Sequence, residues 1–345
     1  AQMLPVLVFQ SGIGLVPGLH PTLAMLAYKG ATIVSIFRGV RVVDALLSAL
    51  QRGGVEWRTH SEVHTVAPAP DGTFRLVDRH GAPVADAHFD HVAVTCGGLS
   101  RPEALAPWEA LGHAVEAPCP SLFGLRLDAP ALAALSGVSV NEVCLSLRDT
   151  KIRARGPLLL TRQGVSGPGV LRLSAFGARV LAAAGHRGTL LIGWCGTADP
   201  ERALEELRCL FAAHGGRQVG SVRAFDLPAR LWNVLLERAE VPTERRCAEL
   251  NRRQLRQLAA VLTADAYAVT GRTTHQGEFV TCGGVSLKSV SPKTMESRHV
   301  PGLFFAGEVL DIDGLTGGFN LTAAWLTGLT AAEGIARRAG EKARD

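Results

Sequence analysis

Residues 307–328 read GEVLDIDGLTGGFNLTAAWLTG and contain five glycines and two aspartates, of which four glycines and both aspartates precede an apolar, helix-like segment. A glycine-rich turn that leads into a helix is typical of nucleotide- and flavin-binding sites, because the unpaired N–H groups at a helix start attract phosphate and other electron-rich groups. Such turns are expected near the start of a domain. This one stands at the far end of a 345-residue chain, so the fold has to account for its position.

The first hundred residues predict strands and a helix that lead to a second glycine turn. Residues 3–9 are apolar and predict a strand, and residues 40–52 carry a helical apolar stripe that stops at Gly53 and Gly54. Asp71-Gly72 predicts a hairpin between two strands. The strand predicted over His91–Thr95 ends in Cys96-Gly97-Gly98, where a ligand can approach the backbone closely.

The middle of the chain has a different character from its ends. From about residue 119 the sequence predicts short β-like runs, namely LFGLRLD, VCLSLRD and GPLLLTRQGVSGPGVLRLSAF. Residues 200–262 are richer in charge and have a helical period. Strands and glycine turns return from about residue 272, and PGLFFAGEVLD predicts a strand that enters the motif at 307–328. Two unlike blocks between similar ends indicate one domain inserted into another.

Composition narrows the class of protein. The length suggests two domains, and 47% apolar against 19% charged residues provides for a sizeable core. The first 28 residues are apolar but have no basic start and are interrupted by proline and glycine, so a buried strand, turn and helix are favoured over a signal peptide or membrane helix. Seven scattered cysteines without a CxxC pair favour a reducing, cytoplasmic location and speak against a disulfide scaffold or a zinc site. No metal site is expected, and the net charge of +5 is a weak indication of an anionic partner.

Three stretches together resemble one family. THQGEFVTCGGVSLKSVSPKTMESRHVPGLFFAGEVLDIDGLTGGFNLTAAWLTG resembles the C-terminal motif of the BaiN/RdsA-type NAD(P)/FAD-dependent oxidoreductases, also described as aminoacetone oxidase-like flavoproteins. GPLLLTRQGVSGPGVLRLSA, at 156–175, resembles an internal motif of the same family, and VAVTCGGLSRP, at 92–102, resembles its strand end. The similarity extends from about residue 37 to 338.

The resemblance implies an α/β fold in which both ends of the chain build one discontinuous, Rossmann-like FAD-binding domain. The expected boundaries are 1–118 and 272–345 for that domain and 119–271 for an inserted β-rich and helical substrate or cap domain. Glu308 and Asp311 would then lie near the ribityl or pyrophosphate part of FAD, and residues 316–320 near the flavin ring. The implied cofactor-binding residues are Gly12, Gly14, Cys96, Gly97, Gly98, Gly307, Glu308, Asp311, Thr316, Gly317, Gly318, Phe319 and Asn320.

The N-terminus departs from the family pattern. The family opens with a strand, a GxGxxG turn, a helix and an acidic residue for the ribose. Here SGIGLVPG spaces Gly12, Gly14 and Gly18 one residue too widely, prolines interrupt the helix start, and no acidic residue precedes Asp44. The family's next glycine- and cysteine-bearing turn is also absent. Residues 1–36 are therefore divergent, truncated or replaced, and an ordinary loop explains these glycines equally well.

The family implies flavin chemistry, namely reduction of a C=C bond with electrons from NAD(P)H. Its members imply a small-molecule substrate or uridine in ribosomal RNA, which is reduced to dihydrouridine. Cys282 and His275 are candidate proton donors, although ordinary structural roles are more common for such residues. Arg245, Arg246, Arg252 and Arg253 are candidate RNA contacts, and a solvated helix face explains them too. The alternative is a flavin-free descendant that acts as an RNA- or protein-binding module.

Overall fold

The computed structural model describes residues 6–9, 40–56, 58–85, 87–273 and 280–342. The chain forms two compact units, one made of residues 1–119 and 280–345 and the other of residues 120–279. The first unit therefore consists of both ends of the chain, and the second is one continuous segment between them.

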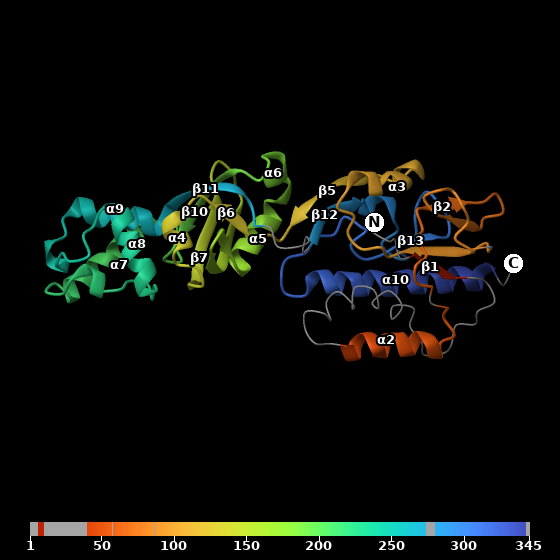
Figure 1. The fold of residues 1–345 in the computed structure, drawn as a ribbon, viewed down its shortest axis with the longest axis horizontal. Helices are drawn as coiled ribbons and strands as arrows, with labels where there is room; N and C mark the ends of the chain where they lie inside the picture. The colour runs from red at the N-terminus through yellow and green to blue at the C-terminus, as the bar shows by residue number, and fades with distance from the viewer. Residues whose placement is uncertain (1–5, 10–39, 57, 86, 274–279, 343–345) are drawn as a thin grey trace. The chain divides into compact units, whose positions relative to one another are not determined.

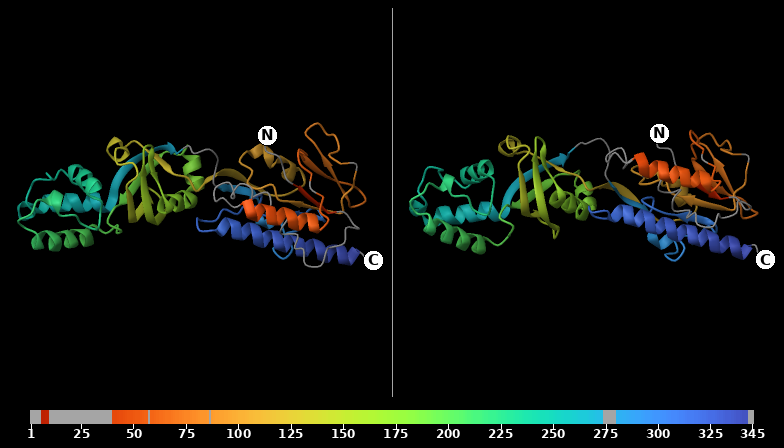
Figure 2. Two further views of the ribbon diagram at one scale, coloured as in Figure 1. Left: turned by 60° about the horizontal axis from the view of Figure 1, so that its bottom comes forward. Right: turned by 90° about the horizontal axis from the view of Figure 1, so that it is seen from below.

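The core sheet of the first unit joins strands that are far apart in the sequence. Its strand order is β1-β4-β13, with β1 at Val6–Phe9, β4 at His91–Val94 and β13 at Leu303–Phe305. β13 runs parallel to β4, with Phe304 opposite Ala93. All residues of β4 and β13 are buried, as expected for a parallel pair that is covered on both faces. In Figures 1 and 2 the long helix α10, Phe319–Lys342, lies along this sheet.

The other elements of the first unit surround this sheet. Helix α2 spans Val40–Arg52, which confirms the predicted helix. Strands β2, Thr65–Pro68, and β3, Phe74–Val77, form the antiparallel hairpin predicted at Asp71-Gly72. The remaining elements are the short helices η1 (Pro102–Ala104), α3 (Ala106–Ala110) and η4 (Leu287–Ser289) and the paired strands β5 (Val115–Ser121) and β12 (Val280–Val285).

The second unit contains a closed six-stranded barrel. The strand order around it is β10-β11-β6-β9-β8-β7, and all pairs are antiparallel. The strands are β6 (Leu125–Leu127), β7 (Ser139–Leu147), β8 (Arg153–Thr161), β9 (Gly164–Ser166), β10 (Gly188–Gly193) and β11 (Asp265–Arg272). The helices of the barrel are α4 (Pro130–Ala133), α5 (Pro168–Phe176) and α6 (Ala178–Ala183).

One part of the sequence-based assignment was wrong in this unit. The run that ends in GVLRLSAF was predicted to be β-like, but residues 168–176 form α5. Gly167, with φ of 97°, breaks the strand that precedes it, and Pro168 occupies the first turn of the helix, where its missing N–H group costs nothing. After Val170, the polar residues Arg172 and Ser174 alternate with leucines as in a strand. This alternation is too short to outweigh the helix-start signals at 167–168.

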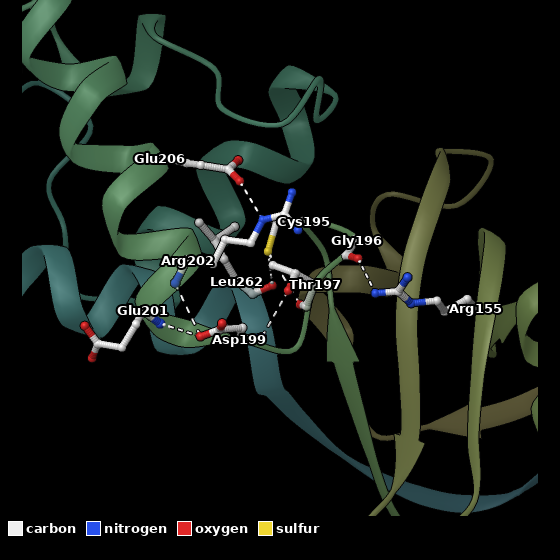
Figure 3. A network of polar contacts seen from close by, with 9 residues as sticks. All are labelled: Arg155, Cys195, Gly196, Thr197, Asp199, Glu201, Arg202, Glu206 and Leu262. Atoms are coloured by element: carbon white, nitrogen blue, oxygen red, sulfur yellow. Dashed lines mark hydrogen bonds and ion pairs between the residues drawn. The ribbon is translucent and has the colours of Figure 1, made fainter.

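A helical part is inserted between β10 and β11. It consists of α7 (Pro200–Ala213), η2 (Val219–Ser221), α8 (Ala229–Arg238), η3 (Cys247–Glu249) and α9 (Arg252–Ala264). Asp199 caps α7 by accepting hydrogen bonds from the backbone N–H groups of Glu201 and Arg202, at 3.0 and 3.3 Å. Figure 3 shows this junction, where the Arg155 guanidinium of β8 also donates to the carbonyl of Gly196 at 3.0 Å.

A polar network at the base of the helical part ties it to the barrel. The buried Asp265 accepts hydrogen bonds from Arg238 of α8, at 2.6 and 2.9 Å, and from the indole N–H of Trp194, at 3.0 Å. It also accepts one from the hydroxyl of Tyr267, over whose ring the Arg238 guanidinium lies. Burial and the neighbouring carboxylate raise the pKa of the Tyr267 hydroxyl, so it stays a donor. The network fixes the first residue of β11 against α8.

Within the described residues, no helix combines the length and the apolar character needed to cross a bilayer.

Candidate functional site

The carboxyl ends of β4 and β13 bring the predicted glycine turns together. Because the two strands are parallel, the turn after β4, with Gly98, and the turn after β13, with Glu308, lie at the same edge of the sheet. A Cβ atom added at Gly98 would lie 2.8 Å from Glu308 Oε1 and 2.6 Å from Thr281 Oγ1. Glu308 Oε1 in turn accepts a hydrogen bond of 2.9 Å from the backbone N–H of Thr281. The site residues therefore come from three separate parts of the chain.

Glycine is required by backbone shape at both strand ends. Gly97 has φ of 78° and Gly307 has φ of 77°, in the left-handed region that other residues adopt only with strain. The turn after β13 is also tied to α10, because the N–H of Gly307 donates to Thr327 Oγ1 at 2.9 Å. These bonds hold the chain reversal between the last strand and the last helix.

Asn320 fixes the second half of the turn. Its side-chain oxygen accepts from the N–H of Gly314 at 2.7 Å, and its side-chain nitrogen donates to the carbonyl of Gly314 at 2.9 Å. The segment that contains Thr316 is thereby closed into a loop before α10 begins. Asn320 thus shapes the loop, and its contact with the cofactor stays a prediction.

The start of α10 presents open backbone. Gly317 and Gly318 have φ of 113° and 92° and are exposed, and a Cβ atom at Gly318 would meet nothing within 4 Å. Phe319, the first residue of the helix, is 60% exposed. The first N–H groups of a helix have no partner within the helix. A planar, electron-rich group or a phosphate therefore fits at this end of α10 without displacing a side chain.

The described half of the site fits a flavin nucleotide on these observations. At Gly98 the neighbouring side chains approach so closely that only a residue without a Cβ atom fits. The exposed glycines 317 and 318 stand directly before a long helix, and Glu308 lies at the end of a strand. Carboxylates in this position are suited to ribose hydroxyl groups. That Glu308, Gly317 and Gly318 bind the cofactor stays a prediction.

Cys282 lies inside the first unit, in the fully buried strand β12. Its Sγ atom and carboxylate oxygens of Asp311 and Asp313 all lie within 4.8 Å of one another. The strand of Cys282 therefore lies close to the loop that carries Asp311. Sequence reasoning singled out Cys282 and Asp311 separately, but not Asp313. His275 lies outside the described residues.

The N-terminal half of the site differs from an ordinary Rossmann arrangement. β1 pairs antiparallel with β4, with Phe9 opposite His91 and Val6 opposite Val94. The carboxyl end of β1 is therefore at the amino end of β4, the edge opposite Gly97 and Gly98. In the parallel arrangement that a dinucleotide-binding turn requires, the carboxyl ends of β1 and β4 would lie at the same edge of the sheet. Gly12 and Gly14 themselves lie outside the described residues.

The predicted RNA contacts lie at one end of the helical part. Arg245 and Arg246 precede η3, and Arg252 and Arg253 begin α9, whose N-cap is Asn251. The segment before η3 pairs with residues 217–220, because the N–H of Val219 donates to the carbonyl of Arg245. Arg245 is half-buried and donates to Gln254 at 3.0 Å, whereas Arg246, Arg252 and Arg253 are exposed.

Sequence reasoning missed two threonines at the site. Thr281 lies against Gly98 and Glu308, and the Oγ1 atom of Thr327, in α10, accepts the hydrogen bond from the Gly307 N–H. Both stand inside the stretch that resembles the family's C-terminal motif, but no local signal marks either one as a site residue. Only their non-local neighbours identify them.

The chain matches the family model described as the HI0933-like protein Rossmann domain over residues 36–334. It is 31% identical over 305 residues to a ribosomal RNA dihydrouridine synthase of Escherichia coli (strain K12), covering 86% of this chain and 72% of that protein. It is 30% identical over 314 residues to the ribosomal RNA dihydrouridine synthase of Haemophilus influenzae, with 86% and 73% covered. A 3-dehydro-bile acid delta(4,6)-reductase of Clostridium scindens is 26% identical over 309 residues, with 86% and 73% covered.

Two solved structures are more distant. An open flavocytochrome c3 fumarate reductase gives a TM-score of 0.32 at 12% identity, and a Rhodococcus jostii 3-ketosteroid-delta4-(5alpha)-dehydrogenase gives 0.37 at 14%. This chain spans 55% and 63% of their lengths, and 86% of its own length is covered in each. The match to the family model covers most of the chain and includes the glycine turns of the site. The chain therefore belongs to the HI0933-like Rossmann domain family, as a flavoprotein oxidoreductase of the BaiN/RdsA type.

Proposed function

We propose that this protein is an FAD-dependent reductase that uses electrons from NAD(P)H to reduce a C=C bond, namely that of uridine in ribosomal RNA, in the cytoplasm. The observation that carries the proposal is the meeting of Gly98, Thr281 and Glu308 at the parallel strand ends. The substrate follows the two relatives at 31% and 30% identity, which are named ribosomal RNA dihydrouridine synthases.

The chain's own residues would hold and orient the cofactor. Bound FAD supplies hydride transfer, which no amino-acid side chain provides. Glu308 would accept hydrogen bonds from ribityl or ribose hydroxyl groups, with Asp311 beside it. The open backbone at Gly317 and Gly318, and the helix start at Phe319, would receive the electron-rich edge of the ring. Gly97 and Gly98 would admit the cofactor close to the end of β4.

Reduction of a C=C bond also requires a proton on the second carbon. Cys282 is our candidate donor because its thiol lies in the strand next to Thr281 and close to Asp311. Replacing Cys282 by alanine should lower kcat and leave the flavin content unchanged. Replacement by serine, which keeps a hydroxyl donor, should retain more activity than alanine. Equal activity of wild-type and both variants would remove Cys282 from the mechanism and leave it as a packed strand residue.

A flavin-free binding protein is the second candidate. The antiparallel β1 and the divergent first 36 residues favour it, because both depart from the half of the site that a dinucleotide requires. Such a protein would bind RNA through Arg246, Arg252 and Arg253, with strong dependence on salt.

A visible absorption spectrum separates the two candidates. Flavin bands near one equivalent, bleached anaerobically by NADH or NADPH, would support the reductase. The second step is to incubate the reduced protein with protein-free ribosomal RNA and to measure dihydrouridine by mass spectrometry of the digested nucleosides. A colourless protein that takes up no added FAD would refute the reductase.

A further inference from the structure

We infer that the β7–β8 hairpin end of the barrel is the surface that binds the RNA backbone. This inference rests on the proposed RNA substrate and assigns the contact to a region other than α9. We call the exposed side chains of Arg148, Lys151, Arg153 and Arg187 the hairpin patch.

The charge of the chain is divided unequally between its two units. Residues 120–279 hold 21 basic and 14 acidic side chains, a net charge of +7, whereas the remainder holds 15 basic and 17 acidic ones, a net charge of −2. A polyanion is therefore attracted to the second unit and not to the first.

Within the second unit, the excess of basic over acidic side chains is concentrated in the barrel. Residues 143–198 contain eight basic side chains and one acidic side chain, Asp149. The helical part, residues 200–264, contains eleven basic and eight acidic ones, a nearly balanced mixture. Some of its arginines are already paired, such as Arg202 with Glu206 at 3.0 Å and Arg208 with Glu205 at 3.5 Å. A paired arginine has less to gain from a phosphate.

The strand register gathers the hairpin patch at one end of the barrel. β7 ends at Leu147 and β8 begins at Arg153, so Arg148 and Lys151 lie in the turn between them. The N–H of Arg148 donates to the carbonyl of Thr189, which places Arg187 on the neighbouring strand end. Arg153 is positioned by its own turn, because its guanidinium donates to the carbonyls of Thr150 and Ile152 at 2.9 and 3.0 Å.

The cations of the hairpin patch have no carboxylate partner in the described part of the chain. Within the described residues, none of the four takes part in an ion pair. Asp149 is in the same turn, but it is exposed and held in a left-handed conformation with φ of 61°. Four exposed, unpaired cations beside one carboxylate form a surface suited to phosphates.

The chain enters and leaves the barrel at the same end as the hairpin patch. β11 reaches this end at Arg272, opposite Leu125 at the start of β6. The helical part leaves from the other end, at Gly193 and Asp265. Arg246, Arg252 and Arg253 therefore belong to the part attached at the end away from the hairpin patch.

The test is RNA binding by two matched triple variants, measured by fluorescence anisotropy on protein-free ribosomal RNA between 0.05 and 0.5 M salt. R148Q/K151Q/R187Q removes three cations of the hairpin patch and leaves Arg153 to support the turn. R202Q/R208Q/R337Q removes the same charge from arginines that are ion-paired. Each lost phosphate contact reduces the slope of log K against log salt by about 0.7 to 0.9, so the first variant should lose a slope of about 2. That change corresponds to about hundredfold weaker binding at 0.1 M salt, against little change in the second variant.

A third variant should gain affinity. Asp149→Asn removes the one carboxylate and keeps a side chain that tolerates the left-handed conformation, so it should bind RNA more tightly. Misfolding does not produce such a gain. Equal binding by the hairpin variant and the control would overturn the inference, as would a larger loss from R246Q/R252Q/R253Q or ultraviolet cross-links confined to residues 245–256.

Flavin content and reduction by NAD(P)H, measured on the same samples, separate this inference from the reductase proposal. RNA binding lost from the hairpin variant with flavin reduction intact supports both. Salt-dependent RNA binding through the hairpin patch in a protein that takes up no FAD would refute the reductase and leave the RNA surface standing. A reducible flavin in a wild-type protein that does not bind RNA would overturn the RNA surface and leave a small-molecule reductase.

Discussion

Replacing Gly334 by alanine is expected to destabilise the first unit, although alanine is the better helix former. Gly334 lies in the middle of α10 and is buried against the segment that precedes β13. An added Cβ atom would lie 2.6 Å from the carbonyl oxygen of Thr294, 2.9 Å from its Cβ atom and 3.1 Å from the Phe304 ring. Two of these contacts are shorter than any that Cβ atoms normally make.

The magnitude follows from two opposing contributions. Alanine in a helix interior gains about 1 kcal/mol over glycine. Overpacking typically costs about 1 to 3 kcal/mol, and a backbone carbonyl yields less readily than a side chain, so we take the upper end. The net loss is then about 2 kcal/mol. For a unit of this size, 1 kcal/mol lowers Tm by about 2 to 4 °C, which gives a shift of about 4 to 8 °C.

Gly340→Ala is the matched control in the same helix. A Cβ atom at Gly340 would meet nothing within 4 Å. This variant should gain less than about 1 kcal/mol, since Gly340 lies near the helix end, where fraying reduces the benefit. Differential scanning calorimetry gives the measurement, because two units are expected to give separable transitions. A Gly334→Ala protein as stable as wild-type, or stabilised as much as Gly340→Ala, would refute the packing of α10 described above.

Three further predictions concern the site and the two cores. Gly98→Ala should retain less flavin than Gly216→Ala, whose added Cβ atom would meet nothing within 4 Å; equal flavin content at equal Tm would contradict the close approach at the strand end. Burial lowers the pKa of His113, so protonation favours the unfolded chain, and stability should fall as the pH drops below the ordinary histidine pKa of about 6.5. Urea titrations at pH 7.5 and 5.5 test this, and His113→Gln should remove part of the dependence; an unchanged pH dependence would count against it. Asp265→Asn leaves the guanidinium of Arg238 without its counter-charge and should destabilise the second unit by about 3 kcal/mol, the lower end for a broken buried pair because Arg238 is 38% exposed; an unshifted transition would show that the network contributes little.

Local signals in the sequence predicted several elements well. The apolar stripe over 40–52, followed by Gly53 and Gly54, corresponds to α2, and Asp71-Gly72 corresponds to the turn between β2 and β3. In these elements the nearest residues along the chain decide the structure. The failure at 168–176 is of the same kind, since Gly167 and Pro168 are local signals that a short alternation concealed.

The site could be predicted from the sequence only through the family motif. The glycines at 97, 98, 307, 317 and 318 carry a recognisable pattern, but their meeting depends on the parallel pairing of β4 with β13. Thr281 has no such pattern. The antiparallel direction of β1 was not predictable either, because a short apolar strand carries no information about the direction of its partner.

The SPKTMES segment shows how a motif can be structural. Its last residue, Ser297, accepts hydrogen bonds from the N–H groups of His299 and Val300 and bonds to the His113 ring at 2.8 Å. Glu296 accepts from the N–H of Gly302 at 2.7 Å and pairs with Arg338 of α10 at 3.0 Å. The segment therefore fastens the last helix to the sheet.

The pairing of β4 with β13 has a consequence for the order in which the two units form during synthesis. The ribosome completes Val94 long before Leu303, and at about 5 to 20 residues per second the interval is about 10 to 40 s. Residues 120–279 form a continuous unit and are synthesised in full during that interval. The barrel is therefore expected to fold on the nascent chain while β4 still lacks its parallel neighbour. The glycine turn at 97–98 acquires the rest of its site only when β13 and α10 have been made, so cofactor uptake should follow the synthesis of those two elements.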